Sequence, residues 1–123
     1  MSFSFLISRF TILHRNSSVK WYNAGMQTPR EESIVKSILK YINSLPRCHA
    51  EKTHGGAYQA GRPDITACIA GRRVELEVKR PGRHATPLQQ RNLDHWTRAG
   101  AVAGVVHSRD EVEELFSAHG LIR

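Results

Sequence analysis

The sequence predicts an α/β fold in which a mixed β-sheet is flanked by helices. Apolar residues recur at helical spacing in three segments, which begin near residues 29, 87 and 109. Between residues 64 and 79 apolar and polar residues alternate in two short runs, as in a β-hairpin. The expected order is helix, three strands, helix, strand, helix, without a repeat, and 123 residues suit one domain.

The first helix is expected from Pro29 to Ser44. Thr28 can cap it, with Pro29 at its first position and Glu31 at its third, which is a capping-box arrangement. An apolar stripe follows and ends before Pro46. Residues 47–61 then predict a short strand and a glycine-rich loop.

The hairpin comes next, and its turn decides which polar residues meet. With a turn at residues 70–71, Asp64 lies directly opposite Glu77. With a turn at residues 71–72, Asp64 faces Lys79 and lies diagonal to Glu77. In both registers the two acids and the amine share one face of the hairpin, while the other face is apolar.

The remaining elements follow a break at Pro81-Gly82. Thr86-Pro87-Leu88-Gln89 starts a helix by the same capping logic, and Gly100 ends it. Residues 101–107 predict a short apolar strand that is buried on both faces. Ser108 or Asp110 then opens a last helix, which finishes near Gly120.

Composition narrows the class of partner. Eighteen Lys and Arg against eleven Asp and Glu give a net charge of +7, which favours a polyanion such as nucleic acid. Two cysteines are too few for a disulfide framework and suit a reducing, cytoplasmic environment. No apolar run reaches the length of a membrane span, so we expect no membrane partner.

Residues 1–25 differ from the rest of the chain. They contain basic residues but no acid, and their apolar residues keep no period. A disordered basic arm, a targeting peptide and a misplaced start that truly lies at Met26 all explain this composition. We favour the misplaced start, because residues 26–123 can form the domain without the preceding segment.

Asp64, Glu77 and Lys79 are the residue types that phosphodiester hydrolysis needs. A divalent cation held by carboxylates neutralises the phosphate and activates a water, and a lysine on the same face can hold that water or the phosphate. The ordinary structural explanation is a solvated strand face with a cross-strand ion pair. Basic residues near the same end could grip a phosphate backbone: Arg62, Arg80, Arg83 and His84.

Two further polar residues have two readings each. Glu31 could supply a third carboxylate, or act only as the capping-box acid of the first helix. Gln89 could contact the site, or only complete the capping box with Thr86. The histidines and cysteines do not have zinc-ligand spacing.

These residues resemble the PD-(D/E)xK nuclease superfamily, and in particular its VRR-NUC branch, the virus-type replication and repair nuclease domain. The likeness rests on Gly61-Arg62-Pro63-Asp64, on Glu77-Val78-Lys79-Arg80-Pro81-Gly82, and on Thr86-Pro87-Leu88-Gln89. Gly100, a closing apolar strand and an acidic last helix extend it. Residues 1–25 lie outside the pattern.

The resemblance implies a restriction-endonuclease-like fold and assigns roles. Asp64, Glu77 and the main-chain carbonyl of Val78 would bind Mg or Mn, and Glu31 rather than Glu32 would complete the metal shell. Lys79 would assist the water, and Gln89 would support the site.

The function expected from this resemblance is a metal-dependent DNA endonuclease. It would act as a homodimer on branched or flapped DNA, like Holliday junction resolvases, during bacterial or phage replication or repair. The alternatives are a nucleic-acid-binding module without hydrolysis and a restriction-like enzyme that cuts duplex DNA.

Overall fold

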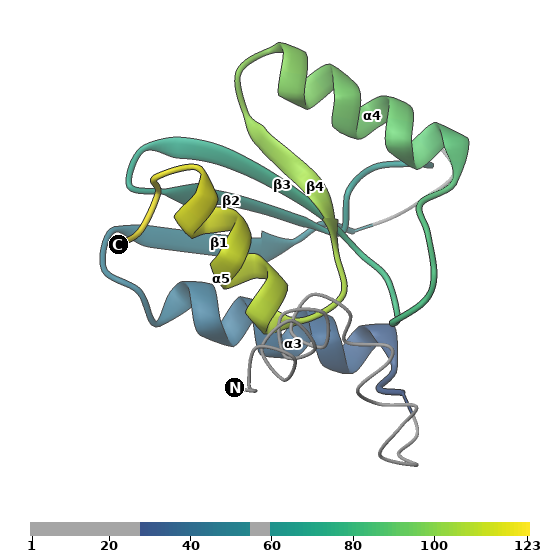
Figure 1. Ribbon diagram of the computed structural model, residues 1–123, viewed down its shortest axis with the longest axis horizontal. Helices are drawn as coiled ribbons and strands as arrows, with labels where there is room; N and C mark the ends of the chain where they lie inside the picture. The colour runs from purple at the N-terminus through teal and green to yellow at the C-terminus, as the bar shows by residue number, and fades with distance from the viewer. Residues whose placement is uncertain (1–27, 55–59) are drawn as a thin grey trace, which may run out of the picture.

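A computed structural model describes residues 28–54 and 60–123. Their sheet has the order β1–β2–β3–β4, with α3 and α5 on one face and α4 on the other (Figure 1). The elements are α3 (Glu31–Asn43), β1 (Cys48–Lys52), β2 (Ile65–Ile69), β3 (Arg72–Val78), α4 (Pro87–Arg98), β4 (Val102–Val106) and α5 (Arg109–Ala118). The predicted fold class and the predicted order of elements are confirmed. Our expectations for residues 1–25 lie outside the described residues.

The sheet is mixed because α4 connects its last two strands. β1 pairs with β2 and β2 with β3 in antiparallel fashion, whereas β3 and β4 run parallel. A parallel pair needs a crossover, and α4 supplies it from the opposite side of the sheet to α3 and α5. None of the described helices is long and apolar enough to cross a membrane.

The β2–β3 hairpin turns at Ala70 and Gly71. Both residues have positive φ, 50° and 91°, as a two-residue turn of the primed type requires. Ile65 therefore pairs with Leu76, and Ile69 with Arg72. The first of the two predicted registers is the one observed.

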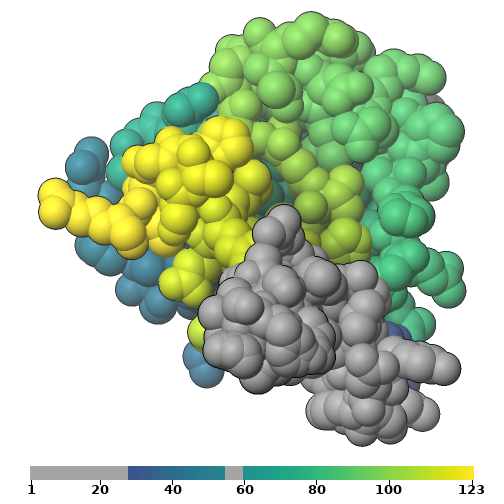
Figure 2. Space-filling model, viewed as in Figure 1, coloured from purple at the N-terminus to yellow at the C-terminus, as the bar shows by residue number. Residues whose placement is uncertain are grey.

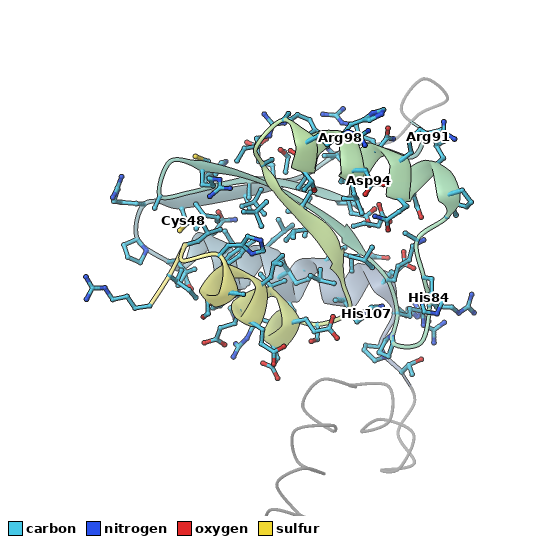
Figure 3. The ribbon with its side chains drawn as sticks, turned by 45° about the horizontal axis from the view of Figure 1, so that its top comes forward. Cys48, His84, Arg91, Asp94, Arg98 and His107 are labelled. Carbon is cyan, nitrogen blue, oxygen red and sulfur yellow. The ribbon has the colours of Figure 1, made fainter. Side chains whose placement is uncertain are left out.

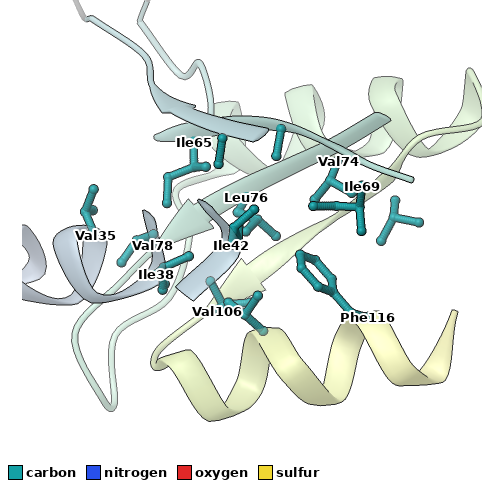
Figure 4. Packing of buried hydrophobic residues seen from close by; sticks show 14 of the residues in the cluster. Val35, Ile38, Ile42, Ile65, Ile69, Val74, Leu76, Val78, Val106 and Phe116 are labelled. Carbon is teal, nitrogen blue, oxygen red and sulfur yellow. The ribbon is translucent and has the colours of Figure 1, made fainter. Parts of the chain in front are cut away.

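The apolar faces of the strands pack against α3 and α5 (Figure 4). Ile38 and Ile42 of α3 and Phe116 of α5 are fully buried. They meet the inward side chains of the sheet, which are Ala50, Ile65, Ala67, Ile69, Val74, Leu76, Val78, Val102 and Val106. Because this core uses one face of β3, the alternate side chains of the strand point to the face that α4 covers.

The predicted starts of the last two helices are confirmed in detail. Thr86 accepts a bond from the main-chain N–H of Gln89, and the Gln89 side chain accepts one from the N–H of Thr86, which completes the capping box. Ser108, rather than Asp110, caps α5 by accepting from the N–H of Glu111 at 3.1 Å.

The predicted cap of the first helix was wrong. α3 begins at Glu31 after Arg30, which has no side-chain capping bond. Thr28 lies two residues before the cap position, and its hydroxyl accepts a bond from Arg80 Nη2 at 2.6 Å. The residue predicted as a local cap therefore makes a long-range contact instead.

The prediction that β4 is buried on both faces was also wrong. Val102 and Val106 are buried, but Ala103, Gly104 and Val105 are half-buried. β4 is one of the two edge strands of the described sheet, and it lies between α4 and α5 on the face drawn in Figure 2. Apolar composition therefore did not indicate full burial here.

The loop before β2 is fastened to α4 at Gly61. Asn92 donates from Nδ2 to the Gly61 carbonyl at 2.7 Å. Gly61 has φ of 79°, and a Cβ there would lie 2.5 Å from Leu88 Cγ. Only glycine combines this backbone conformation with such a close approach.

We predict that Gly61→Ala destabilises the protein more than Gly71→Ala does. Both substitutions force alanine into positive φ, at a cost of about 1 kcal/mol each. Only Gly61→Ala adds a steric conflict, which should raise its cost by roughly 1–3 kcal/mol. Urea denaturation of both variants measures the difference. Equal losses would contradict the close packing of Gly61 on α4, since a Cβ at Gly71 meets nothing within 4 Å.

Candidate active site

Asp64 is held where β2 begins and β3 ends. Its carbonyl accepts a bond from the Thr53 N–H at 2.8 Å, just after β1 ends. Its carboxylate atom Oδ2 accepts a bond from the Val78 N–H, also at 2.8 Å. Two main-chain contacts thus aim the Asp64 carboxylate at the last residues of β3.

Two neighbouring glutamates of β3 share the polar face of the sheet, and both are 2% exposed. Glu75 is partnered at Oε2, which accepts from the Thr66 hydroxyl at 2.6 Å and from Arg73 Nε at 2.7 Å. Arg73 in turn stacks over Trp96 of α4 at 4.2 Å. Glu75 is therefore an ordinary satisfied buried acid.

Glu77 is not satisfied in this way. Its Oε1 is buried and has no hydrogen-bond partner in the described part of the chain. The amine of Lys79 lies 3.9 Å from Oε2, beyond hydrogen-bond distance. A buried carboxylate oxygen without a partner is costly, so this residue calls for an explanation other than stability.

The pKa of Glu77 is raised to about 8, most strongly by burial. A hydrogen bond to the Asp64 carboxyl and the negative charge of Asp64 raise this pKa further. Lys79 lowers it, and Glu31 adds a smaller increase. Near neutral pH the metal-free pair therefore retains a proton between two carboxyl groups.

Glu31 contributes its charge from the first turn of α3. It is half-buried, whereas Glu32 beside it is exposed, and the pKa of Glu77 responds to Glu31. This placement favours Glu31 over Glu32 as the acid of the first helix that faces the site. The metal-binding role that we predicted for Glu31 stays a prediction.

The donor set fits a hard divalent cation. No three Asp, Glu, His or Cys side chains within residues 28–54 and 60–123 lie close enough together to ligate one ion. Asp64 and Glu77 form a pair, and Mg²⁺ is commonly held by one or two carboxylates while it keeps several waters. A cation between them would satisfy the unpartnered Glu77 oxygen and remove the repulsion that raises the pKa.

The other predicted site residues fall into two groups. Gln89 and Arg80 already have structural partners, since Gln89 Oε1 bonds the Thr86 N–H and Arg80 bonds Thr28. Arg62, Arg83 and His84 have exposed side chains. Figure 3 shows His84 on the segment between β3 and α4. Their predicted roles stay predictions.

Our sequence analysis did not identify Asn92, Gly61 or Thr53 as positioning residues. Thr53 fixes the Asp64 main chain, and Asn92 fixes the loop that leads to Asp64. The glycine-rich composition indicated a loop, but no local pattern pairs Gly61 with a residue on a later helix.

Comparisons with known proteins support the fold. One solved structure described as a VRR_NUC domain protein is 19% identical and has a TM-score of 0.62, covering 74% of this chain and 88% of that one. A second, described as a VRR_NUC domain, is 24% identical with a TM-score of 0.61, covering 71% and 94%. No protein-family profile and no curated protein matches the chain in sequence. The chain therefore has the fold of the VRR_NUC domain.

We predict that the metal-free protein loses stability as the pH rises from about 5 to 8. The pKa of Glu77 is about 8 in the folded state, above its ordinary value of 4.5. The folded protein therefore binds this proton more tightly than the unfolded chain does. The resulting stabilisation is complete at low pH and is lost as the pH rises to about 8. Glu77→Gln should remove this part of the slope, which is on the order of a few kcal/mol.

The test is chemical denaturation of both proteins in EDTA across that pH range. His107, whose pKa is also raised, titrates in both proteins and cancels in the difference. A difference between wild type and Glu77→Gln that does not change with pH would contradict the buried, proton-sharing acid pair.

Proposed function

We propose that this VRR_NUC-type fold is a nuclease that hydrolyses DNA phosphodiester bonds with a bound divalent metal. The observation that carries the proposal is the contrast between two buried glutamates on one strand face. Glu75 has two partners, whereas Glu77 faces Asp64 with an unpartnered oxygen. A fold seldom retains such an acid pair unless a ligand completes it.

Mg or Mn would be held by Asp64 and Glu77, together with the Val78 carbonyl, while Glu31 would act on the site through its charge rather than as a ligand. Such an ion neutralises phosphate charge and lowers the pKa of a water. Lys79 lies on the same face with its side chain 15% exposed, close to Glu77 but not hydrogen-bonded to it. In the proposed reaction its amine holds the attacking water or a phosphate oxygen and offsets the developing negative charge.

The proposed substrate is branched or flapped DNA. A net charge of +7 supports a polyanion, and Arg62, Arg83 and His84 supply exposed basic groups on the segments that precede Asp64 and follow Lys79. A homodimer is part of the proposal, because symmetric cutting of two strands needs two sites and this domain offers one. The alternatives remain a binding module without hydrolysis and a restriction-like duplex endonuclease.

We predict that Lys79→Ala lowers Mg- or Mn-dependent cleavage by roughly 100-fold or more, because it removes charge stabilisation at the reacting phosphate. Lys36→Ala, on the exposed face of α3, is the matched control and should cut like wild type. Cleavage rates on a four-way junction, a flap and linear duplexes of the same sequence provide the measurement.

Metal binding can be separated from the chemical step in the same proteins. Mn should raise the melting temperature of wild type and Lys79→Ala, but not that of Asp64→Asn. Wild type that binds branched DNA and cuts none of the substrates in either metal would establish the binding module instead. Equal rates on junction and duplex would favour the restriction-like enzyme.

We predict different effects for two arginines that lie three residues apart. Arg83→Ala should weaken DNA binding, because one exposed phosphate contact is lost. The slope of the logarithm of the binding constant against the logarithm of the salt concentration should become shallower by about one. Arg80→Ala should mainly lower the free energy of unfolding, because Arg80 holds Thr28 at the start of α3. Salt titrations of DNA binding and urea denaturation distinguish the two. The same salt slope in Arg83→Ala and wild type would remove Arg83 from the DNA contact.

A further inference from the structure

The segment between β3 and α4, residues 79–86, links the proposed catalytic lysine to the helix that covers the site. We call it the connector. Its first residue donates a main-chain bond to Val106 of β4 at 3.0 Å, and its last caps α4. In the middle, Gly82 has φ of 86° and the Arg83 N–H bonds the Arg80 carbonyl at 2.9 Å. The exposed side chains of Arg83 and His84 project from this turn.

His107 bridges the connector to α5. Its Nδ1 lies 2.9 Å from Glu111 Oε1, and its Nε2 lies 2.9 Å from the Arg83 carbonyl oxygen. The same Glu111 oxygen accepts the His107 main-chain N–H at 2.9 Å. Figure 3 labels His84 of the connector and His107 at the end of β4. One imidazole thus joins the last helix to the connector.

Both ring partners are acceptors. An ionised carboxylate and a main-chain carbonyl can only accept, and neutral imidazole has one N–H for two such partners. Only the doubly protonated ring satisfies both contacts. A neutral ring can donate to only one of the two partners, and the charged Glu111 carboxylate is the stronger acceptor, so the remaining lone pair would face the Arg83 carbonyl and oppose that contact.

The charged groups around His107 support the doubly protonated ring. Glu111 and Glu114 of α5 line the same shallow surface depression as His107, and β4 contributes only the apolar Val105 and Val106 to it. From the connector the contact is the Arg83 carbonyl. The pKa of His107 is raised, first by its hydrogen bond to Glu111, against burial that lowers it.

We propose that His107 is a positioning residue whose imidazolium clasps the connector, and thereby sets the Arg83 and His84 side chains for DNA binding. The clasp itself follows from the contacts of His107. Its effect on DNA rests on the proposed nuclease function. Because the folded state raises the pKa of His107, the clasp is complete at low pH and is lost as the pH rises through that pKa.

Amide exchange and NMR test the clasp in the full chain without DNA. The His107 ring should titrate above 6.5, and Glu111→Gln should move its midpoint back toward that value. Above the midpoint, protection of the connector amides, corrected for intrinsic exchange, should fall roughly tenfold, as expected for loss of one charge-assisted bond. A midpoint at or below 6.5, or equal protection on both sides of it, would overturn the clasp.

Two substitutions form a matched pair. A glutamine amide can occupy the position of Nε2 and donate to the Arg83 carbonyl at any pH. An asparagine amide reaches only the position of Nδ1. His107→Gln should therefore keep the connector protected at pH 5.5 and pH 9, whereas His107→Asn should leave it unprotected at both, roughly as in high-pH wild type. Identical exchange in the two variants would reject the contact with Arg83.

The proposed effect of His107 on DNA binding is tested by measuring DNA affinity in EDTA at pH 5.5 and pH 9. The ratio of the dissociation constant at high pH to that at low pH should be larger in wild type than in His107→Gln. Other titrating groups are common to both proteins and cancel. Equal ratios would reject the role in DNA binding. Absence of DNA binding by wild type would instead count against the proposed function, and exchange would still decide the clasp.

Discussion

The register of the β2–β3 hairpin is the constraint on which the rest of the structure depends. The turn at Ala70 and Gly71 sets Ile65 opposite Leu76 and thereby sends one row of β3 side chains into the core and the other toward α4. A slip by one residue would exchange the two rows, placing Glu75 and Glu77 in the apolar core. The chemistry of the site and the packing of α3 and α5 are therefore fixed by the same turn.

The polar face of β3 carries two buried glutamates whose surroundings differ. Around Glu75, a hydroxyl, a guanidinium and an aromatic ring form a closed network that also fastens α4 to the sheet. Around Glu77 the same kind of side chain meets another carboxyl group and an amine that stays out of bonding range. The fold tolerates this strain because main-chain bonds hold Asp64 from both sides. Rigid surroundings keep the site in a geometry that its own charges oppose.

Much of this arrangement could be predicted from the sequence because its signals are local. Alternation gave the two faces of the hairpin, and Thr86 with Gln89 indicated the start of α4, since a cap needs only residues three positions apart. Long-range contacts had no such signal. Arg80 bonds Thr28, which lies outside the helix that we predicted it to cap, and Asn92 reaches back to Gly61. The half-buried state of β4 depends on its place at the edge of the sheet, which composition alone does not reveal.

The unsatisfied acid has an implication for how such domains evolve. The core lies on the opposite face of β3 and does not use Glu77, so an uncharged replacement of similar size there would leave the apolar packing untouched. For the proposed nuclease, lineages released from selection on cleavage could therefore lose Glu77 while the fold persists. Under that proposal, only selection on the activity would preserve the acid.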